Sequence, residues 1–133
     1  MIGRLILGEA STSHPDGTFS LLRGGITIVY GESAPFAFKG ALVVCLESDI
    51  GDQGSHRFDV TCMDEDGGEA LPKLEGGFDV GKKGAVSTFN LGINTKLKKK
   101  GRYVFVLRVD NVQRDTWTLT TTDELPQGLD GGK

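Results

Sequence analysis

Short segments in which apolar side chains occupy every second position dominate this chain, and glycines stand between many of them. Alternation with a period of two is typical of a β-strand with one buried face, whereas an amphipathic helix repeats its apolar residues every three or four positions. The clearest segments are Ile26–Tyr30, Phe36–Leu46, Phe58–Cys62, Tyr103–Val109 and Trp117–Leu119. No segment between them has the helical period, so the pattern predicts an all-β chain.

The spacing of these segments favours one architecture. We expect about eight to nine short strands at intervals of about 8–12 residues, which is typical of an antiparallel sandwich or barrel. A chain of 133 residues is the size of one domain. The prediction is therefore a single-domain antiparallel β-sandwich, immunoglobulin-like or jelly-roll-like, over residues 1–122. Residues 123–133 contain acids, glycines and a proline with little to bury, and we expect a flexible tail.

The same alternation assigns side chains to faces. Phe36–Glu47 is the longest and most apolar segment and is expected at the centre of its sheet. We expect His56–Met63 to pair back against it across the polar loop Ser48–Ser55. The residues predicted to face the core are Phe36, Phe38, Leu42, Val44 and Leu46 in the first strand, Phe58, Val60 and Cys62 in the second, and Tyr103, Phe105, Leu107 and Val109 opposite Trp117 and Leu119 in the last hairpin.

The two cysteines fall on opposite sides of this arrangement. Cys62 shares the core face, whereas Cys45 alternates with core residues and lies on the other face. A disulfide needs Cα atoms within about 7 Å and converging side chains. We therefore predict two free thiols and a reducing compartment, the cytoplasm.

A basic patch is the first candidate site. It consists of Lys96, Lys98, Lys99, Lys100 and Arg102, which we place in one loop. Such a patch can dock an acidic protein surface or phosphates, and a charged loop beside an edge strand also prevents association between sheets. Because aromatic residues do not interleave with it and the net charge is −3, a nucleic-acid partner is not expected.

Other polar groups are too few or too scattered for chemistry. Asp64, Asp66 and Glu69 offer fewer oxygen ligands than a calcium loop usually supplies, so a solvated turn is the preferred interpretation. Cys45 and His56 flank one loop, but a thiolate–imidazole pair also needs an orienting third group. We expect no enzymatic activity, no metal and no cofactor. No stretch of about 18 apolar residues is present, so no membrane span is expected.

The C-terminal residues support one sharper hypothesis. Gly131 and Gly132 precede the last residue, Lys133. Ubiquitin-like modifiers end in a flexible tail with two glycines, because a side chain would block the channels of the activating enzymes. Gly131 and Gly132 are therefore candidates for conjugation, although the chain also contains other glycine pairs and lacks the helix that a ubiquitin fold requires.

Several segments resemble one known family. They are Ser20–Ile26, Phe58–Glu75 with its Asp64-Glu65-Asp66-Gly67 turn, Phe89-Asn90-Leu91 and Gly101–Phe105. Their order over residues 4–121 resembles the DUF6941 family of small bacterial proteins. The resemblance implies a single β-sandwich with no assigned activity, and it carries no catalytic residue to this chain.

These observations favour a non-enzymatic structural or interaction module. Such a module presents its sheet faces and loops to a protein partner or assembles with its own copies. Two alternatives stay open: a modifier joined through Gly131-Gly132, and an accessory or decoration protein of a phage virion.

Overall fold

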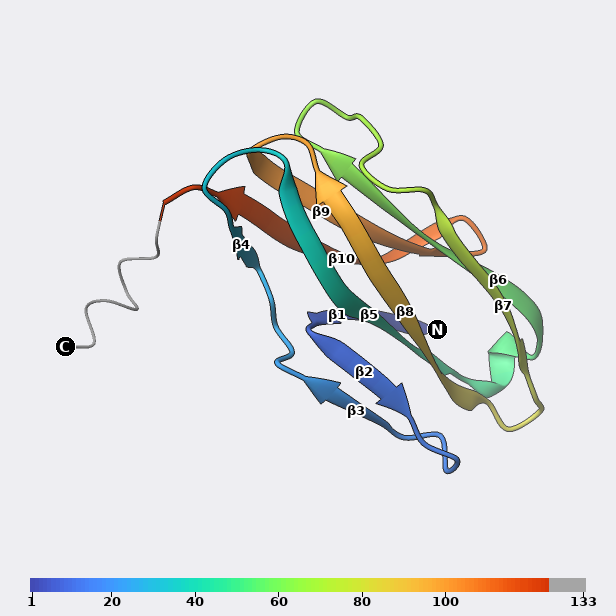
Figure 1. The fold of residues 1–133 in the computed structure, drawn as a ribbon. Coiled ribbons are helices and arrows are strands. Elements are labelled where there is room, and N and C mark those ends of the chain that lie inside the picture. Colours follow the sequence, from blue (N-terminus) through green and yellow to red (C-terminus); the bar gives the residue numbers. More distant parts are fainter. Residues whose placement is uncertain (125–133) are drawn as a thin grey trace.

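The computed structural model describes residues 1–124 as ten β-strands with one short 3₁₀ turn and no α-helix (Figure 1). The strands are β1 (Ile2–Gly8), β2 (Ala10–Ser13), β3 (Phe19–Leu22), β4 (Ile28–Tyr30), β5 (Phe36–Ser48), β6 (Gly54–Asp64), β7 (Leu74–Val80), β8 (Ala85–Leu97), β9 (Gly101–Val109) and β10 (Val112–Thr122), and the 3₁₀ turn η1 spans Ile50–Asp52. The prediction of an all-β chain is confirmed. Within residues 1–124, no helix is long and apolar enough to cross a membrane.

The strands form three sheets. Their orders are β1-β5-β8, β4-β10-β9-β6-β7 and β2-β3. β5 lies at the centre of its sheet, as predicted. Pairing is antiparallel except between β4 and β10, which run parallel, so the expectation of purely antiparallel sheets is wrong. The strand count of ten also exceeds the predicted eight to nine.

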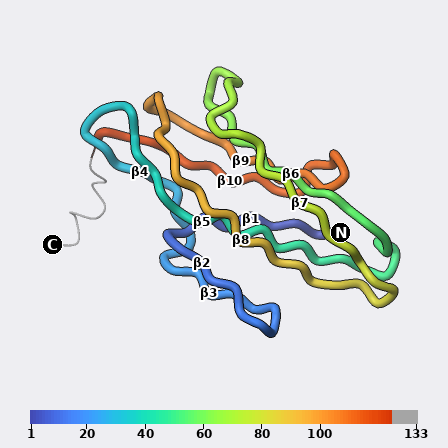
Figure 2. Tube along the Cα trace, turned by 45° about the vertical axis from the view of Figure 1, so that its right-hand side comes forward, coloured from blue at the N-terminus to red at the C-terminus, as the bar shows by residue number. Residues whose placement is uncertain are grey.

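The two larger sheets lie face to face and share one apolar core (Figure 2). Alternate residues of β5 and β6 point into it, and the side chains of Leu42, Val44 and Leu46 have no exposed surface. The predicted faces of these strands are confirmed. In the last hairpin, Trp117 pairs with Phe105 and Leu119 with Tyr103. Asp110 and Asn111 turn this hairpin with positive φ values of 50° and 67°, which Asp and Asn tolerate better than most residues.

The predicted pairing of the long strand with His56–Met63 is wrong. β5 pairs with β1 and β8, whereas β6 pairs with β7 and β9 in the other sheet. The segment between β5 and β6 carries the chain from one sheet to the other. There the carboxylate of Asp49 accepts the amide hydrogen of Ile50, and the carboxylate of Asp52 accepts that of Asp49. This reciprocal capping stabilises η1 and redirects the chain.

The hairpin of β2 and β3 forms the third sheet, which lies beside the two larger layers (Figure 2). The chain bends at Glu9 between β1 and β2, and β3 pairs with β2. A Cβ atom on Gly8 would lie 2.5 Å from the side chain of Leu21. β2 packs against β5 and β8 on the face away from the core, where Val43 is fully buried.

Leu42 offers a test of the shared core. Its side chain is fully buried, so Leu42→Ala should remove apolar contacts and leave a cavity. We expect the free energy of unfolding in urea to fall by about 3 kcal/mol. The control is Ile50→Ala, because Ile50 is 68% exposed in η1; that change should cost less than about 0.5 kcal/mol. Equal losses in the two variants would contradict the proposed core.

Candidate functional site

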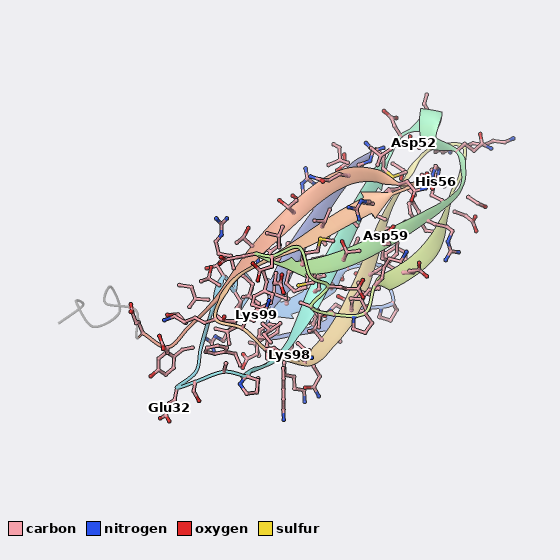
Figure 3. All side chains as sticks on the ribbon, turned by 90° about the horizontal axis from the view of Figure 1, so that it is seen from above. Glu32, Asp52, His56, Asp59, Lys98 and Lys99 are labelled. Atoms are coloured by element: carbon pink, nitrogen blue, oxygen red, sulfur yellow. The ribbon has the colours of Figure 1, made fainter. Side chains whose placement is uncertain are left out.

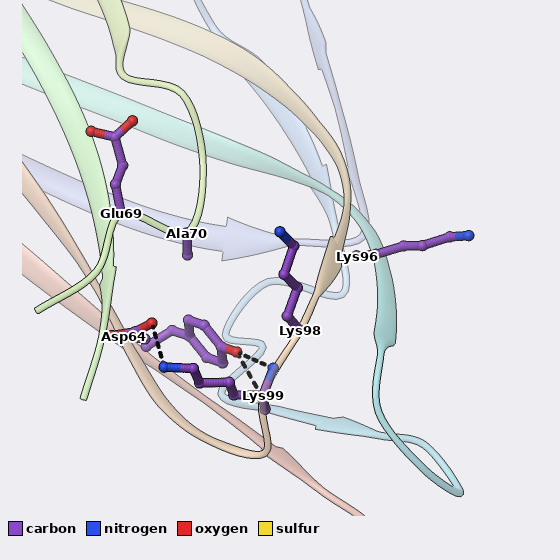
Figure 4. A pocket seen from close by; sticks show the side chains of 7 residues that line it. Asp64, Glu69, Ala70, Lys96, Lys98 and Lys99 are labelled. Atoms are coloured by element: carbon purple, nitrogen blue, oxygen red, sulfur yellow. Dashed lines mark hydrogen bonds and ion pairs between the residues drawn. The ribbon is translucent and has the colours of Figure 1, made fainter. Parts of the chain in front are cut away.

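The structure divides the predicted basic patch among three elements. Lys96 belongs to β8, Lys98–Lys100 form the turn, and Arg102 belongs to β9. The loop is shorter than expected because the ladder between β5 and β8 continues to Leu97. Figure 4 shows the Lys96 and Lys99 side chains pointing in different directions.

An acidic turn faces this basic turn and pairs with it. Lys99 Nζ lies 2.8 Å from Asp66 Oδ2 and 3.5 Å from Asp64 Oδ2. The backbone amide of Arg102 donates to Glu65 Oε1 at 2.7 Å, and Lys100 Nζ lies 2.8 Å from an Asp123 carboxylate oxygen. Two of the predicted partner-binding lysines therefore already have acidic partners. Among residues 1–124, no carboxylate forms an ion pair with Lys98.

Asp64 of the acidic turn forms hydrogen bonds within the turn and stabilises its backbone. Asp64 accepts the amide hydrogens of Asp66 and Gly68, each at 2.9 Å. These hydrogen bonds, the one from Gly68 foremost, and the nearby Lys99 lower the pKa of Asp64. In the part of the chain that the structure describes, no three His, Cys, Asp or Glu side chains are arranged to hold a metal ion.

Two buried hydroxyls fix the backbone of the basic turn, and the sequence analysis did not identify them. Tyr103 Oη accepts the Lys99 amide hydrogen at 3.0 Å and donates to the Lys99 carbonyl at 2.6 Å. Thr121 Oγ1 donates to the same carbonyl and accepts the amide hydrogen of Gly101. These two buried hydroxyls thus hold the backbone of the turn from the core side, while the lysine ammonium groups of the turn remain at the surface.

His56 is engaged at both ring nitrogens at the opposite end of the molecule from Lys98 and Lys99 (Figure 3). Nδ1 lies 2.6 Å from Asp110 Oδ2, and Nε2 lies 2.5 Å from the Asp52 carbonyl oxygen. Since both partners are acceptors, the arrangement suits the imidazolium form, in which both nitrogens donate. The Asp110 hydrogen bond and, secondly, the Asp52 carbonyl raise the pKa of His56. The ring also stacks on Phe78.

The structure does not bring Cys45 and His56 together. Cys45 lies on β5 in one sheet and His56 on β6 in the other. Both cysteines are free, as predicted. Burial raises the pKa of Cys45, and it raises the pKa of Cys62 to about 12, so both thiols stay protonated at neutral pH.

Two of the hollows beside these elements are the largest described; a third, of about 60 Å³, lies between the acidic turn and Lys99, Lys100 and Arg102. One of about 120 Å³ is lined by Asp64, Glu69, Lys98, Lys99 and Tyr103, among others, and separates the acidic turn from the basic turn. The other, of about 350 Å³, lies between β2 and the outer face of β5 and β8. Neither gathers a nucleophile, a base and an orienting group, which is what acid–base or nucleophilic catalysis requires.

The edges of the two larger sheets differ sharply in how they are protected. Exposed edges invite pairing with other strands, and proteins blunt them by shortening, charging, bulging or covering them. β4 has only three residues. β7 has seven and carries the exposed acids Glu75 and Asp79. Both edges of the five-stranded sheet therefore have a protective feature.

The edge of β1 is covered by the neighbouring sheet. A register shift in β10 between Gln113 and Asp115 is a bulge of the kind that re-aims a side chain. Asp115 accepts the amide hydrogen of Leu5 at 2.8 Å. The amides of Gly25 and Ile26 donate to the carbonyl of Leu7 at 2.8 and 3.0 Å. The Leu5 amide and the Leu7 carbonyl, which β1 directs away from β5, thus have partners within the fold.

β8 has one such feature, the exposed charge of Lys96 near its C-terminal end, and is otherwise unprotected. It spans thirteen residues, pairs with β5 in an unbroken register and is the last strand of its sheet. From Ala85 to Thr95 it contains no charge and no proline. Within residues 1–124, no other strand pairs with it. The outer edge of β8 is the second candidate site. The sequence analysis did not identify it, because a strand is an edge only by its place in the order of strands, which the hydrophobic pattern does not give.

The glycines predicted for conjugation, Gly131 and Gly132, lie outside the described residues, as does most of the predicted tail.

The fold defines an all-β protein with two large apposed sheets and a covering hairpin. A family model described as a family of unknown function, DUF6941, matches residues 5–122, and the chain belongs to this family. The predicted resemblance is confirmed. No curated protein and no solved structure matches the chain significantly.

The pair of His56 and Asp110 predicts a pH dependence of stability. A raised folded-state pKa of His56 means that its contribution is complete below the unfolded value of about 6.5 and is lost as the pH rises through the folded value. The pKa of Asp110 is lowered, chiefly by the His56 hydrogen bond, so its contribution is lost only as the pH falls below about 4. His56→Gln should therefore lower the free energy of unfolding more at about pH 5.5 than at about pH 9.

Urea unfolding at both pH values measures this difference. The control introduces His56→Gln into an Asp110→Asn background, where the difference should shrink. A loss independent of pH in the wild-type background would show that the ring acts through packing on Phe78 alone.

Proposed function

We propose that this protein is a non-enzymatic interaction module that binds another protein strand along the open edge of β8. The observation that carries this proposal is the thirteen-residue edge, which lacks charge from Ala85 to Thr95 and has no pairing partner on one side within the described chain. Strand addition to such an edge satisfies backbone hydrogen bonds and takes specificity from alternate side chains.

The architecture suits this role. We propose that the two larger sheets form one β-sandwich, which their common buried cluster supports. The sandwich is a rigid support for β8, because β5 holds it along its whole length.

The alternative contact surface is the basic turn, and its binding of a partner stays a prediction. Lys99 and Lys100 already form ion pairs with Asp66 and Asp123. In contrast, no strand of the described chain pairs with the outer backbone groups of β8. We therefore place the contact at β8 first.

A non-enzymatic role is supported by the engagement of the polar groups. Both nitrogens of His56 and the carboxylate of Asp64 are used within the fold. The two free thiols are consistent with the proposed location in a bacterial cytoplasm.

Photo-crosslinking tests the proposed contact. A benzoylphenylalanine at Val86, which is 74% exposed at the start of β8, should form protein adducts in cells that produce the chain. The same residue at Val112, which is 50% exposed at the β9–β10 hairpin, should not form those adducts, because it lies on another strand. Mass spectrometry of the adducts identifies the protein joined.

The adducts must also depend on the backbone of β8. They should disappear with Gly92→Pro, which removes an amide hydrogen, and persist with Gly92→Ala. Adducts that form equally from both positions, or that ignore Gly92→Pro, would contradict the proposal.

A further inference from the structure

We propose that the strand that binds β8 is the β8 of a second copy of this chain. Two copies would pair antiparallel about a twofold axis centred on Leu91, and their three-stranded sheets would join into one sheet of order β1-β5-β8-β8-β5-β1. This inference rests on the proposed function, because it names the partner of the same edge.

The hydrogen bonds of β1 reveal which backbone groups of β8 point outward. Leu5 and Leu7 direct their groups away from β5, toward Asp115 and toward Gly25 and Ile26. Their partners Val44 and Leu42 must then direct theirs toward β8, since bonded and non-bonded pairs alternate in an antiparallel ladder.

The same alternation continues one strand further. Val44 pairs with Phe89 and Leu42 with Leu91, so Phe89 and Leu91 direct their groups back to β5. The groups of Thr88, Asn90 and Gly92 consequently point away from the sheet. A regular ladder of donors and acceptors is thus available along the outer edge of β8.

The side chains of β8 are complementary to those of a second β8 that runs antiparallel to it. With the centre at Leu91, Phe89 lies opposite Ile93 of the other copy on the core side. Phe89 and Leu91 are only partly buried at this edge, so pairing buries more of them. On the outer face, Thr88 lies opposite Asn94 and Asn90 opposite Gly92, so no charges meet there. The Asn90 side chain donates to Ser13 Oγ of its own chain, so what Asn90 offers the second copy is its backbone.

The charges at the two ends select this register. Lys96 of one copy lies opposite Val86 of the other, and Val86 pairs with Glu47 on β5. Both Lys96 and Glu47 are exposed on the same outer face. They would lie two strand spacings apart, about 10 Å, which the extended side chains of a lysine and a glutamate can span together. Glu47 also lies 3.7 Å from Arg4 Nη1 of its own chain, and because both side chains are exposed, the carboxylate can face Lys96 of the other copy as well.

Neighbouring registers lose this match. A centre at Gly92 would bring Lys96 opposite Thr88, whose neighbours across the sheet are Cys45 and then Arg4. A centre at Asn90 would bring Lys96 opposite Gly84, beyond the end of β8. The register centred on Leu91 is the one that pairs opposite charges.

Sedimentation of the purified chain tests self-association. The wild type should form a dimer in a concentration-dependent manner at micromolar concentrations. Gly92→Pro removes an outward amide hydrogen in each copy, because Gly92 would bond with Asn90 of the other, and it should weaken the dimer at least about tenfold. Gly92→Ala is the matched control, since a Cβ atom there meets nothing within 4 Å, and its dimer should persist.

A charge exchange tests the register with residues whose replacement should leave the fold intact. At low salt, Lys96→Glu and Glu47→Lys should each weaken the dimer several-fold, and the double variant should restore it. Both side chains are exposed, so these variants still test pairing through β8 if the Gly92→Pro variant fails to fold. A dimer unaffected by the exchange would overturn the register.

The outcomes separate this inference from the proposed function. A purified chain that stays monomeric, while Val86 still forms adducts with a different protein in cells, overturns self-pairing and leaves the proposed function standing. A monomeric chain without adducts at Val86 overturns both. A dimer that Gly92→Pro leaves intact would show that the copies meet through another surface.

Discussion

Apolar contact between the inner faces of the two larger sheets is the interaction on which the remaining structure depends. β5 and β9 supply much of it, and side chains such as Leu42 and Leu107 are fully buried there. Neither sheet can bury one face alone, because its second layer is the other sheet. The polar elements, including the paired turns, the His56 cluster and the outer edge of β8, take their positions from this packing.

The faces of the strands could be predicted from the sequence, but their partners could not. Alternation in Phe36–Leu46 is a local property, and it placed Leu42 and Val44 in the core correctly. Pairing is set by contacts between residues far apart in the chain. A polar loop after β5 is compatible with a return in the same sheet or a crossing to the other. The crossing depends on the capping of η1 by Asp49 and Asp52, which involves only polar residues and leaves no trace in the hydrophobic pattern.

The candidate sites show the same division. The sequence located the basic residues and the acidic turn as separate motifs, yet the structure joins them through Lys99, Asp64 and Asp66. The distance along the chain between Lys99 and Asp66 conceals this pairing. His56 and Asp110 likewise meet because β6 pairs with β9, which brings the start of one strand beside the end of the other. The open edge of β8 could not be predicted at all, because edge status requires the order of strands in the finished sheet.

Asp115 has a consequence for assembly that reaches beyond its own strand. A sheet with one unprotected edge strand stops growing once two molecules have paired. A sheet with two unprotected edge strands can add subunits indefinitely and form a fibre. Asp115 occupies the Leu5 amide, and the amides of Gly25 and Ile26 occupy the Leu7 carbonyl, so part of the β1 edge is engaged within the molecule. In the proposed dimer, these contacts at β1 oppose the addition of further subunits at the two outer edges of the joined sheet.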